Sequence, residues 1–493
     1  MEHIAGSGAS AATIVFLLLA VGLALSFEFV NGFHDTANAV ATVIYTNTLP
    51  PWIAVVWSGL WNLIGVLISS GAVAFGIVAL LPVELVINVG SASGFAMVFS
   101  LLISAIIWNV GTWYFGLPAS SSHTLIGSIV GVGLANSLIF GSHTFGDGVN
   151  WTKVQETLAA LITSPIVGFV GAALLLLLMK ALIRVPELYR EPPKGQPPSP
   201  WIRLLLVLTC TGVSFAHGSN DGQKGMGLIM LILIGIVPGV YALNPGLSQA
   251  QVASIYSASQ SASTVFDRMA KGANESAAEA NKALNGFLKT SGKLDETTWT
   301  AVATINHLIT SDLQGKSSTT QIAPSDRGAV RSHIYLISAS ISKIGKLKGF
   351  TDPADAKALA DYAKQLNGTT NYIPVWVKVA VALFLGFGTM IGWKRIVVTV
   401  GERIGKTHMT YAQGASAEMV AYATIQAASQ YGLPVSTTHI LSSGVAGTMF
   451  ANRSGLQGQT VRNILLAWVL TLPVCVFLGS LLFALGLRLV AAF

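Results

Sequence analysis

Residues 31–38 read Asn31-Gly32-Phe33-His34-Asp35-Thr36-Ala37-Asn38, and residues 217–224 read His217-Gly218-Ser219-Asn220-Asp221-Gly222-Gln223-Lys224. Each acid-bearing stretch is followed later in the chain by a turn with hydroxyl side chains and a histidine. These turns read Gly116-Leu117-Pro118-Ala119-Ser120-Ser121-Ser122-His123 and Gly432-Leu433-Pro434-Val435-Ser436-Thr437-Thr438-His439. Duplication of such a pair is typical of secondary transporters, which build a central site between two repeats. The sequence therefore predicts a transporter made of two membrane repeats.

The composition is that of a membrane protein. Hydrophobic residues make up 52% and charged residues 10% of the 493 residues, whereas soluble domains have about 25% charged residues. The apolar stretches 11–26, 52–81 and 464–487 approach or exceed the roughly 20 residues that cross a bilayer. The formal charge of +7 is spread along the chain, so no nucleic-acid partner is expected. We expect an all-α polytopic membrane protein with about 10–12 membrane segments, beginning with a retained helix over 11–27 rather than a signal peptide.

The chain divides into five parts. They are membrane repeat 1 (1–184), a proline-rich linker (185–200), the first part of membrane repeat 2 (201–243), an inserted soluble helical domain (244–371) and the second part of repeat 2 (372–493). The insert is polar and lacks an apolar run of membrane length. Within it, Asp352-Pro353 predicts the start of a helix and Gly368 predicts its end.

Basic residues near the ends of the apolar segments predict the orientation. They cluster in the linker (Arg184, Arg190, Lys194, Arg203) and after Gly392 (Lys394, Arg395, Arg403, Lys406). Both clusters are expected in the cytoplasm by the positive-inside rule. The two repeats then run in opposite directions, as inverted-topology repeats, across the plasma (bacterial inner) membrane. The insert is predicted on the outer face, in the periplasm or extracellular space.

The two acids are the first candidates for coupling-ion residues. An ionised carboxylate inside a membrane helix costs about 2.5–3.5 kcal/mol on insertion scales, so Asp35 and Asp221 need a cation, a proton or a water-lined cavity. A structural cap of a broken helix is the alternative. Gly32, Gly218 and Gly222 allow the backbone to unwind beside the acids, which predicts broken helices with free carbonyl oxygens.

The two turns have the opposite polarity. Pro118 and Pro434 separate the two arms of a helical hairpin, and the residues that follow occupy the first turn of a new helix. Backbone N–H groups at a helix start bind oxyanions, and hydroxyl groups add uncharged donors. Two such tips facing each other would cradle a tetrahedral anion. The predicted anion-binding hydroxyls are those of Ser120, Ser121, Ser122, Ser436, Thr437 and Thr438.

The histidines near these motifs have several interpretations. His123 and His439 follow the tips and could close the hairpins by hydrogen bonding, respond to protonation or cap the turn. A structural role is favoured for them, and His34 beside Asp35 is the better candidate for titration. No two His or Cys residues stand at zinc-ligand spacing on one helix face. Cys210 and Cys475 lie in apolar segments and do not suggest a disulfide framework.

Taken together, these motifs resemble the inorganic phosphate transporter (PiT) family, and closely its bacterial low-affinity phosphate permeases. The resemblance covers both membrane halves and is carried by residues 32–39 and the paired turns. It implies phosphate uptake by alternating access, driven by sodium in some members and by protons in others. It also implies one site formed by Asp35 and Asn38 of the first acid-bearing stretch, Asn220 and Asp221 of the second, and the residues of both hairpin tips. A neutral complex of a divalent metal with hydrogen phosphate is associated with the bacterial members; the sequence itself assigns no metal ligand.

One position departs from the internal symmetry. Asn38 stands three residues after Asp35, but Lys224 stands three residues after Asp221. A lysine there would neutralise Asp221 or attract the anion, and either would weaken a sodium site. The alternative is a side chain that snorkels to the surface. We therefore expect proton coupling, with Asp35, Asp221, His34 and Lys224 as the coupling residues.

Other functions are compatible with parts of the sequence. A sodium-coupled symporter or a permease for sulfate or another oxyanion would use the same cradle. A channel is less suited to acids and helix ends that meet in mid-membrane. An intramembrane hydrolase using Ser120–Ser122 with His123 is disfavoured, because a serine and a histidine on one turn rarely reach each other. We expect no enzyme and no cofactor, with phosphate and the lipid bilayer as partners and a homo-oligomer as an open alternative.

Overall fold

Two long helices, α2 (Ala11–Tyr45) and α9 (Pro200–Ile236), carry the two acid-bearing stretches. The protein is described by a computed structural model, which covers residues 11–80, 91–140, 149–193, 195–273, 275–289 and 292–490. Within these ranges the side chains of Asp35, Thr36, Asn38, Ala92 and Val490 are not described. The described part of the chain is helical and contains no β-strand, in agreement with the predicted all-α fold.

The remaining membrane-region helices divide between the two halves of the chain. In the first half they are α3 (Pro51–Ile68), α4 (Ala72–Val78), α6 (Ala92–Tyr114), α7 (Ser121–Phe140) and α8 (Trp151–Leu182). In the second half they are α10 (Pro238–Tyr241), α16 (Val375–Ile391), α17 (Lys394–Glu402), α18 (Tyr411–Gln430), α19 (Thr437–Ala451) and α20 (Gly458–Val490). The linker between the halves contains one turn of 3-10 helix, Pro186–Tyr189.

The predicted unwinding of the acid-bearing stretches is wrong. Both α2 and α9 are continuous helices through residues 31–38 and 217–224. The glycines serve close helix packing instead. A Cβ atom on Gly32 would lie 2.5 Å from the backbone nitrogen of Thr389 in α16, and one on Gly218 would lie 2.1 Å from the carbonyl oxygen of Asn62 in α3. The helix crossings α2–α16 and α3–α9 therefore depend on the absence of a side chain.

We predict that Gly218→Ala destabilises the protein, because the new methyl group must push α9 away from the α3 backbone. Overpacking of this kind costs about 1–3 kcal/mol. Thermal unfolding in detergent would measure the loss. Gly22→Ala in α2 is the matched control, since a Cβ atom there meets nothing within 4 Å. Equal melting temperatures for the two variants would contradict the packing argument.

The two halves of the membrane part exchange their last helices. Helix α8 of the first half packs against α18 and α19, and α20 of the second half packs against α6 and α7. Glycines again mark the contacts: Gly447 faces the carbonyl oxygen of Phe169 in α8, and Gly131 faces that of Val476 in α20, both at 2.1 Å from a Cβ position. Neither hairpin is therefore packed only by its own half.

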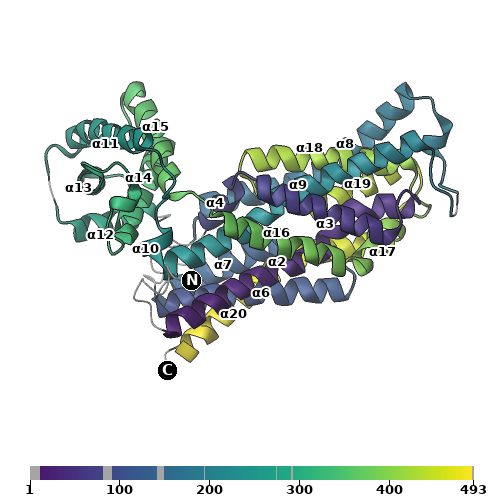
Figure 1. The fold of residues 1–493 in the computed structure, drawn as a ribbon, viewed down its shortest axis with the longest axis horizontal. Helices are drawn as coiled ribbons and strands as arrows, with labels where there is room; N and C mark the ends of the chain where they lie inside the picture. Colours follow the sequence, from purple (N-terminus) through teal and green to yellow (C-terminus); the bar gives the residue numbers. More distant parts are fainter. Residues whose placement is uncertain are drawn as a thin grey trace.

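Helices α11 (Gln249–Ala270), α12 (Ala277–Leu288), α13 (Glu296–Leu313), α14 (Arg327–Lys346) and α15 (Pro353–Thr370) form a bundle beside the membrane helices (Figure 1). This bundle has its own hydrophobic core, which includes Phe266 and Tyr362. The start of α15 is as predicted, because the Asp352 side chain accepts the N–H of Ala354 and Pro353 is the first helical residue. The predicted stop at Gly368 is wrong, since α15 continues to Thr370.

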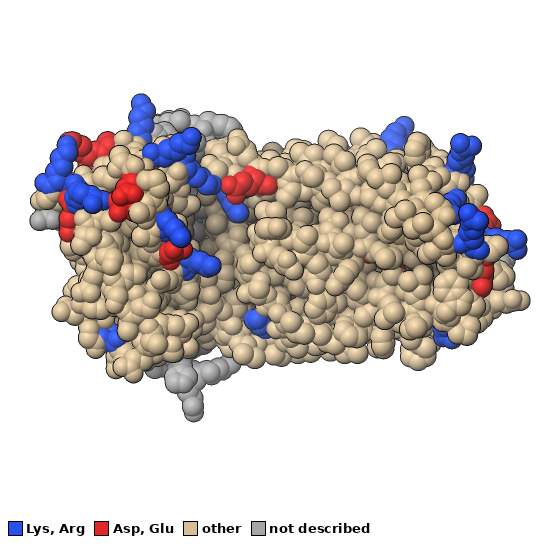
Figure 2. Space-filling model, turned by 90° about the horizontal axis from the view of Figure 1, so that it is seen from above, with Lys and Arg blue, Asp and Glu red and all other residues tan. Residues whose placement is uncertain are grey.

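Seven described helices are long and apolar enough to cross a membrane. The expected 10–12 segments exceed this number because α18 and α19 contain many small and polar residues, and α16 has only 17 residues. Figure 2 shows charged side chains gathered at the two ends of the molecule, with a broad, largely uncharged band between them on this face. This distribution suits a multi-pass membrane protein.

Candidate functional site

Both Gly-Leu-Pro turns form the tips of helical hairpins, α6–α7 and α18–α19. Gly116 and Gly432 have φ angles of 66° and 65°, the left-handed conformation that ends the first arm. The second arm begins with a capping serine in each case. Ser120 accepts the backbone N–H of His123 at 3.2 Å, and Ser436 accepts that of His439 at 3.1 Å. The two tips therefore have the same local structure.

The two tips lie against each other inside the protein. The Ser122 hydroxyl donates to the carbonyl oxygen of Val435 at 2.7 Å. The rings of His123 and His439 are 4.7 Å apart, centroid to centroid, and His439 stacks on Trp468 of α20 at 3.9 Å. The indole N–H of Trp468 also donates to the carbonyl oxygen of Pro118, at 2.9 Å. The starts of α7 and α19, separated by more than 300 positions in sequence, thus meet in one buried junction.

The predicted hydroxyl side chains and prolines are all placed at this junction. Pro118 and Pro434 are buried in the extended part of the turns, and Thr437 and Thr438 are buried in the first turn of α19. Ser121 is buried at the start of α7.

Asp221 and Lys224 of α9 reach the first tip. The Lys224 Nζ atom lies 2.7 Å from Asp221 Oδ2, and both side chains are at most 1% exposed. The hydroxyl of Ser121 lies 3.5 Å from the same carboxylate oxygen and 3.4 Å from Lys224 Nζ. His217 Nε2, one helical turn before Asp221, is 3.4 Å from Oδ2. A carboxylate and an ammonium group therefore stand directly beneath the start of α7.

The snorkelling alternative for Lys224 is wrong. Its side chain is fully buried, so its charge is balanced inside the protein by Asp221. A buried charge pair of this kind is held by the mutual attraction of its members and is costly to separate.

The residues that precede the two acids attach α2 and α9 to the hairpins. His34 Nε2 is 2.8 Å from the carbonyl oxygen of Asn109 in α6, so this nitrogen carries the hydrogen and donates it. The Asn220 amide donates to Ser429 Oγ at 2.9 Å and to the carbonyl oxygen of Leu433 at 3.3 Å, both at the end of the first arm of the second hairpin. His34 thus has a structural contact rather than a free ring, and Asn220 borders the second tip. Asp35 and Asn38 lie in α2, but their side chains are outside the described part of the structure.

Sequence reasoning missed two buried acids. Glu28 of α2 is 0% exposed and lies against α9, where a Cβ atom on Gly225 would be 2.6 Å from Glu28 Oε1. Neither of its carboxyl oxygens meets hydrogen-bond geometry with a described residue, although the Asn31 amide and the charges of Lys224 and Asp221 are near enough to act on it. The available signal was spacing, since Glu28 is two helical turns before Asp35.

Glu418 of α18 is the second missed acid and is also 0% exposed. It accepts the hydroxyl of Thr209 in α9 at 2.5 Å. Thr209 precedes Asp221 by about 18 Å along the helix axis. Glu418 is therefore remote from the Asp221–Lys224 pair.

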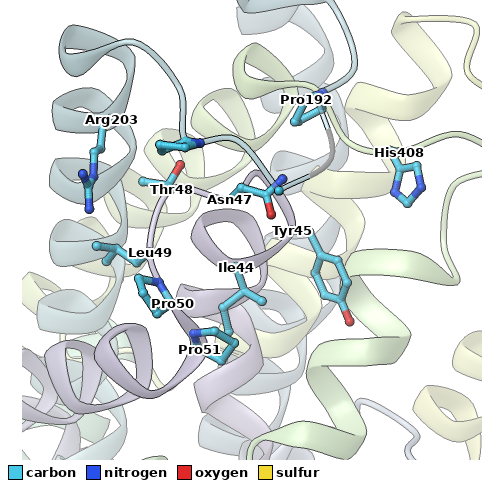
Figure 3. A pocket seen from close by; sticks show the side chains of 12 residues that line it. Ile44, Tyr45, Asn47, Thr48, Leu49, Pro50, Pro51, Pro192, Arg203 and His408 are labelled. Carbon is cyan, nitrogen blue, oxygen red and sulfur yellow. The ribbon is translucent and has the colours of Figure 1, made fainter.

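Among the described residues, the junction of the two hairpin tips contains neither a metal site nor the cavity that lies near the linker. Within the described ranges no group of three His, Cys, Asp or Glu side chains could hold a metal ion. A cavity of about 700 Å³ lies between the α2–α3 turn and the linker, with Arg203 and His408 on its border (Figure 3). None of the predicted site residues whose side chains are described lines it.

Residues 31–479 match the model of the "Phosphate transporter family". The chain belongs to this family. Two relatives from Escherichia coli K12, the "Low-affinity inorganic phosphate transporter PitA" and its PitB counterpart, are each 43% identical over 97% of this chain and at least 97% of their own. A "Probable low-affinity inorganic phosphate transporter" from Bacillus subtilis is 25% identical over 95% of this chain and 96% of its own.

A solved structure titled "The sodium-dependent phosphate transporter" shares the fold. It covers 96% of this chain and 99% of its own chain with a TM-score of 0.52 and 16% sequence identity. The family match confirms the resemblance carried by the two motifs. It also confirms a transporter rather than a hydrolase, in a multi-pass membrane protein.

Proposed function

We propose that this transporter imports inorganic phosphate across the bacterial inner membrane by proton-coupled symport, with alternating access to the junction between the two hairpin tips. The observation that carries this proposal is the meeting of both tips with the Asp221–Lys224 pair in one buried place. Anion donors and a charge-compensating group are then within reach of the same ligand.

The arrangement of the helices supports two inverted repeats. Tyr45 at the end of α2 and Arg203 near the start of α9 line the same cavity, so these two corresponding helices run in opposite directions. The exchanged packing of α8 and α20 follows the same two-fold relation. A rocking motion of one hairpin pair against the other helices would open the junction first to one side and then to the other.

The two tips form the proposed phosphate site. The first-turn N–H groups of α7 and α19 and the hydroxyls of Ser120, Ser121, Ser122, Ser436, Thr437 and Thr438 would donate to phosphate oxygens. Asn220 adds an amide beside the second tip, and Asn38 is the proposed counterpart in α2. Because α7 and α19 begin at the same point, the positive ends of both helix dipoles act on one anion.

Charge balance favours protons over sodium. Phosphate import against an inside-negative potential costs about 2.3 kcal/mol per charge per 100 mV, so a cation must accompany the anion. Lys224 already stands at 2.7 Å from Asp221, which weakens a sodium site there. The ammonium group of Lys224 balances the charge of the Asp221 carboxylate. The nearby carboxyl group of Glu28 then requires a proton or a second cation. Glu28, Asp35 and Asp221 are the proposed proton-coupling carboxyls.

One experiment distinguishes proton-coupled phosphate import from three alternative functions. Sodium coupling is the second candidate, because a protein titled as sodium-dependent has the same fold. A neutral metal–hydrogen phosphate complex is a candidate cargo, since the Asp221 carboxylate borders the proposed anion site. A sulfate permease would use the same tips. The insert is proposed to lie in the periplasm, because the basic residues Arg203, Arg395 and Arg403 belong to the opposite end of the molecule.

Phosphate uptake into proteoliposomes tests the proposal. We expect a pH gradient, acid outside, to drive accumulation without sodium, and a tenfold excess of sulfate to leave the rate nearly unchanged. Sodium dependence would show that the coupling ion is sodium rather than the proton, and the transport function would stand. Strong competition by sulfate would indicate a permease for sulfate or a related oxyanion. Accumulation that requires a divalent cation would identify the metal complex as the cargo.

A further inference from the structure

A second cavity, with both polar and apolar lining, lies where the helical bundle of α11–α15 meets the membrane helices. It has a volume of about 340 Å³. Helices α10 and α14 border it, close to the point where the two parts of the molecule join in Figure 1. Its polar lining comes mainly from the bundle: Arg331, Ser332, Tyr335, Asn367 and Asn371. Its apolar lining comes from α4 and the end of α9.

Arg331 is the charged group of this cavity and is only partly used by the fold. Its Nη1 donates to the carbonyl oxygens of Ala242, at 2.9 Å, and Thr370, at 2.8 Å. Its Nε and Nη2 groups contact no acceptor in the described part of the chain, and the side chain lines the cavity. The guanidinium group therefore retains donors for a ligand.

No described acid compensates this charge. Among the described residues that line the cavity there is no Asp or Glu. Burial lowers the pKa of Arg331 to about 10, which still leaves the group protonated at neutral pH. A half-buried charge with no described counterion is unfavourable, and an oxyanion that accepts from Nε and Nη2 would reduce this cost.

Arg327, one turn earlier in α14, shows the contrast. Its Nε, Nη1 and Nη2 donate to the carbonyl oxygens of Ile322, Gly239 and Thr320 at 2.7–2.9 Å. Every nitrogen of this guanidinium is thus engaged within the protein. Arg327 fastens α10 to the bundle, whereas Arg331 both fastens the chain and faces a cavity.

We propose that this cavity is a second anion site, in which Arg331 binds a phosphate oxyanion together with the hydroxyl and amide groups around it. The ligand is free inorganic phosphate, which docks here on the outer side before it reaches the hairpin tips. The docking role rests on the proposed uptake function and on the outer position of the bundle. The anion site itself rests only on the cavity and Arg331.

Phosphate binding to the purified full-length protein in lipid-free detergent tests the site directly. The background is a variant with the membrane pair replaced, Asp221→Asn with Lys224→Met. We expect phosphate still to raise the melting temperature of this variant, because a ligand that binds the folded state stabilises it. Adding Arg331→Gln should reduce that rise, and adding Arg327→Gln should leave it. A rise that is insensitive to Arg331→Gln would overturn the proposal.

Uptake kinetics test the docking role. Arg331→Gln is expected to raise the KM for phosphate about tenfold, which corresponds to about 1.4 kcal/mol, with Vmax unchanged. Arg327→Gln should change KM less than about twofold. An unchanged KM for Arg331→Gln would contradict docking at this site. If Arg331→Gln does not fold, Ser332→Leu narrows the cavity without altering Arg331 and should raise KM in the same way; an unchanged KM there would count equally against the proposal.

The same measurements separate the possible failures. Arg331-dependent phosphate binding in a protein that transports no phosphate would sink the proposed function and keep the anion site. Normal phosphate uptake without any Arg331-dependent binding would sink the site and keep the function. Stabilisation by anionic phospholipid nanodiscs, with no effect of free phosphate in detergent, would assign the site to a lipid headgroup and overturn the docking role.

Discussion

Lys224→Met is expected to abolish phosphate uptake and to lower the melting temperature substantially. The substitution leaves Asp221 at 1% exposure without the ammonium group that stands 2.7 Å away. Removing one partner of a buried charge pair costs about 3–5 kcal/mol, because the other charge is left uncompensated. Uptake into proteoliposomes and thermal unfolding of the same preparation would measure both effects.

The double variant Asp221→Asn with Lys224→Met separates stability from transport. It removes both charges, so we expect the melting temperature to recover while uptake stays absent. Lys346→Met is the matched control, since its ion pair with Glu156 is exposed and contributes at most about 1 kcal/mol. Undiminished uptake by Lys224→Met would show that the pair is structural. Obligatory sodium coupling together with normal uptake by Lys224→Asn would refute the link between this lysine and proton coupling.

Glu28→Gln is expected to abolish accumulation driven by a pH gradient while phosphate exchange across the membrane persists. The amide resembles the protonated acid, so the carrier can still reorient with phosphate bound but can no longer release a proton at this position. Accumulation under a pH gradient and counterflow of labelled phosphate, measured on one preparation, distinguish the two activities.

Glu418→Gln is the appropriate comparison for Glu28→Gln. Both acids are fully buried, but Glu418 is bonded to Thr209 and is remote from the Asp221–Lys224 pair. We expect this variant to retain accumulation at a rate within about threefold of the wild type, because the change removes at most one hydrogen-bond partner. Loss of accumulation in both variants, or in neither, would remove the special role assigned to Glu28.

Local patterns predicted the features that depend on near neighbours in sequence. The Gly-Leu-Pro turns form hairpin tips because a left-handed glycine and a proline act on the backbone within a few residues. The Asp352 cap follows from the same kind of short-range hydrogen bond. In α14, Ile334, Ile337 and Ile341 recur at helical spacing and are buried in the core of the bundle.

Local patterns failed where a neighbouring helix decides the outcome. Glycine at positions 32 and 218 permits an unwound backbone, but it equally permits close contact between helices, and the backbones of α16 and α3 fill the space. Gly368 permits a helix stop, yet α15 continues for two residues to Thr370. In each case the residue type allowed two structures.

The sequence by itself determined a membrane protein with duplicated motifs, its family and the local structure of the hairpin tips. These properties depend on composition, on repeated motifs and on hydrogen bonds between residues a few positions apart. The tertiary structure alone decided that Ser122 meets Val435, that Lys224 turns inward to Asp221, that Glu28 lies against Gly225 and that Arg331 lines a cavity. Such contacts join residues on different elements, and they arise only when close packing selects one arrangement of helices that individually could pack in several ways.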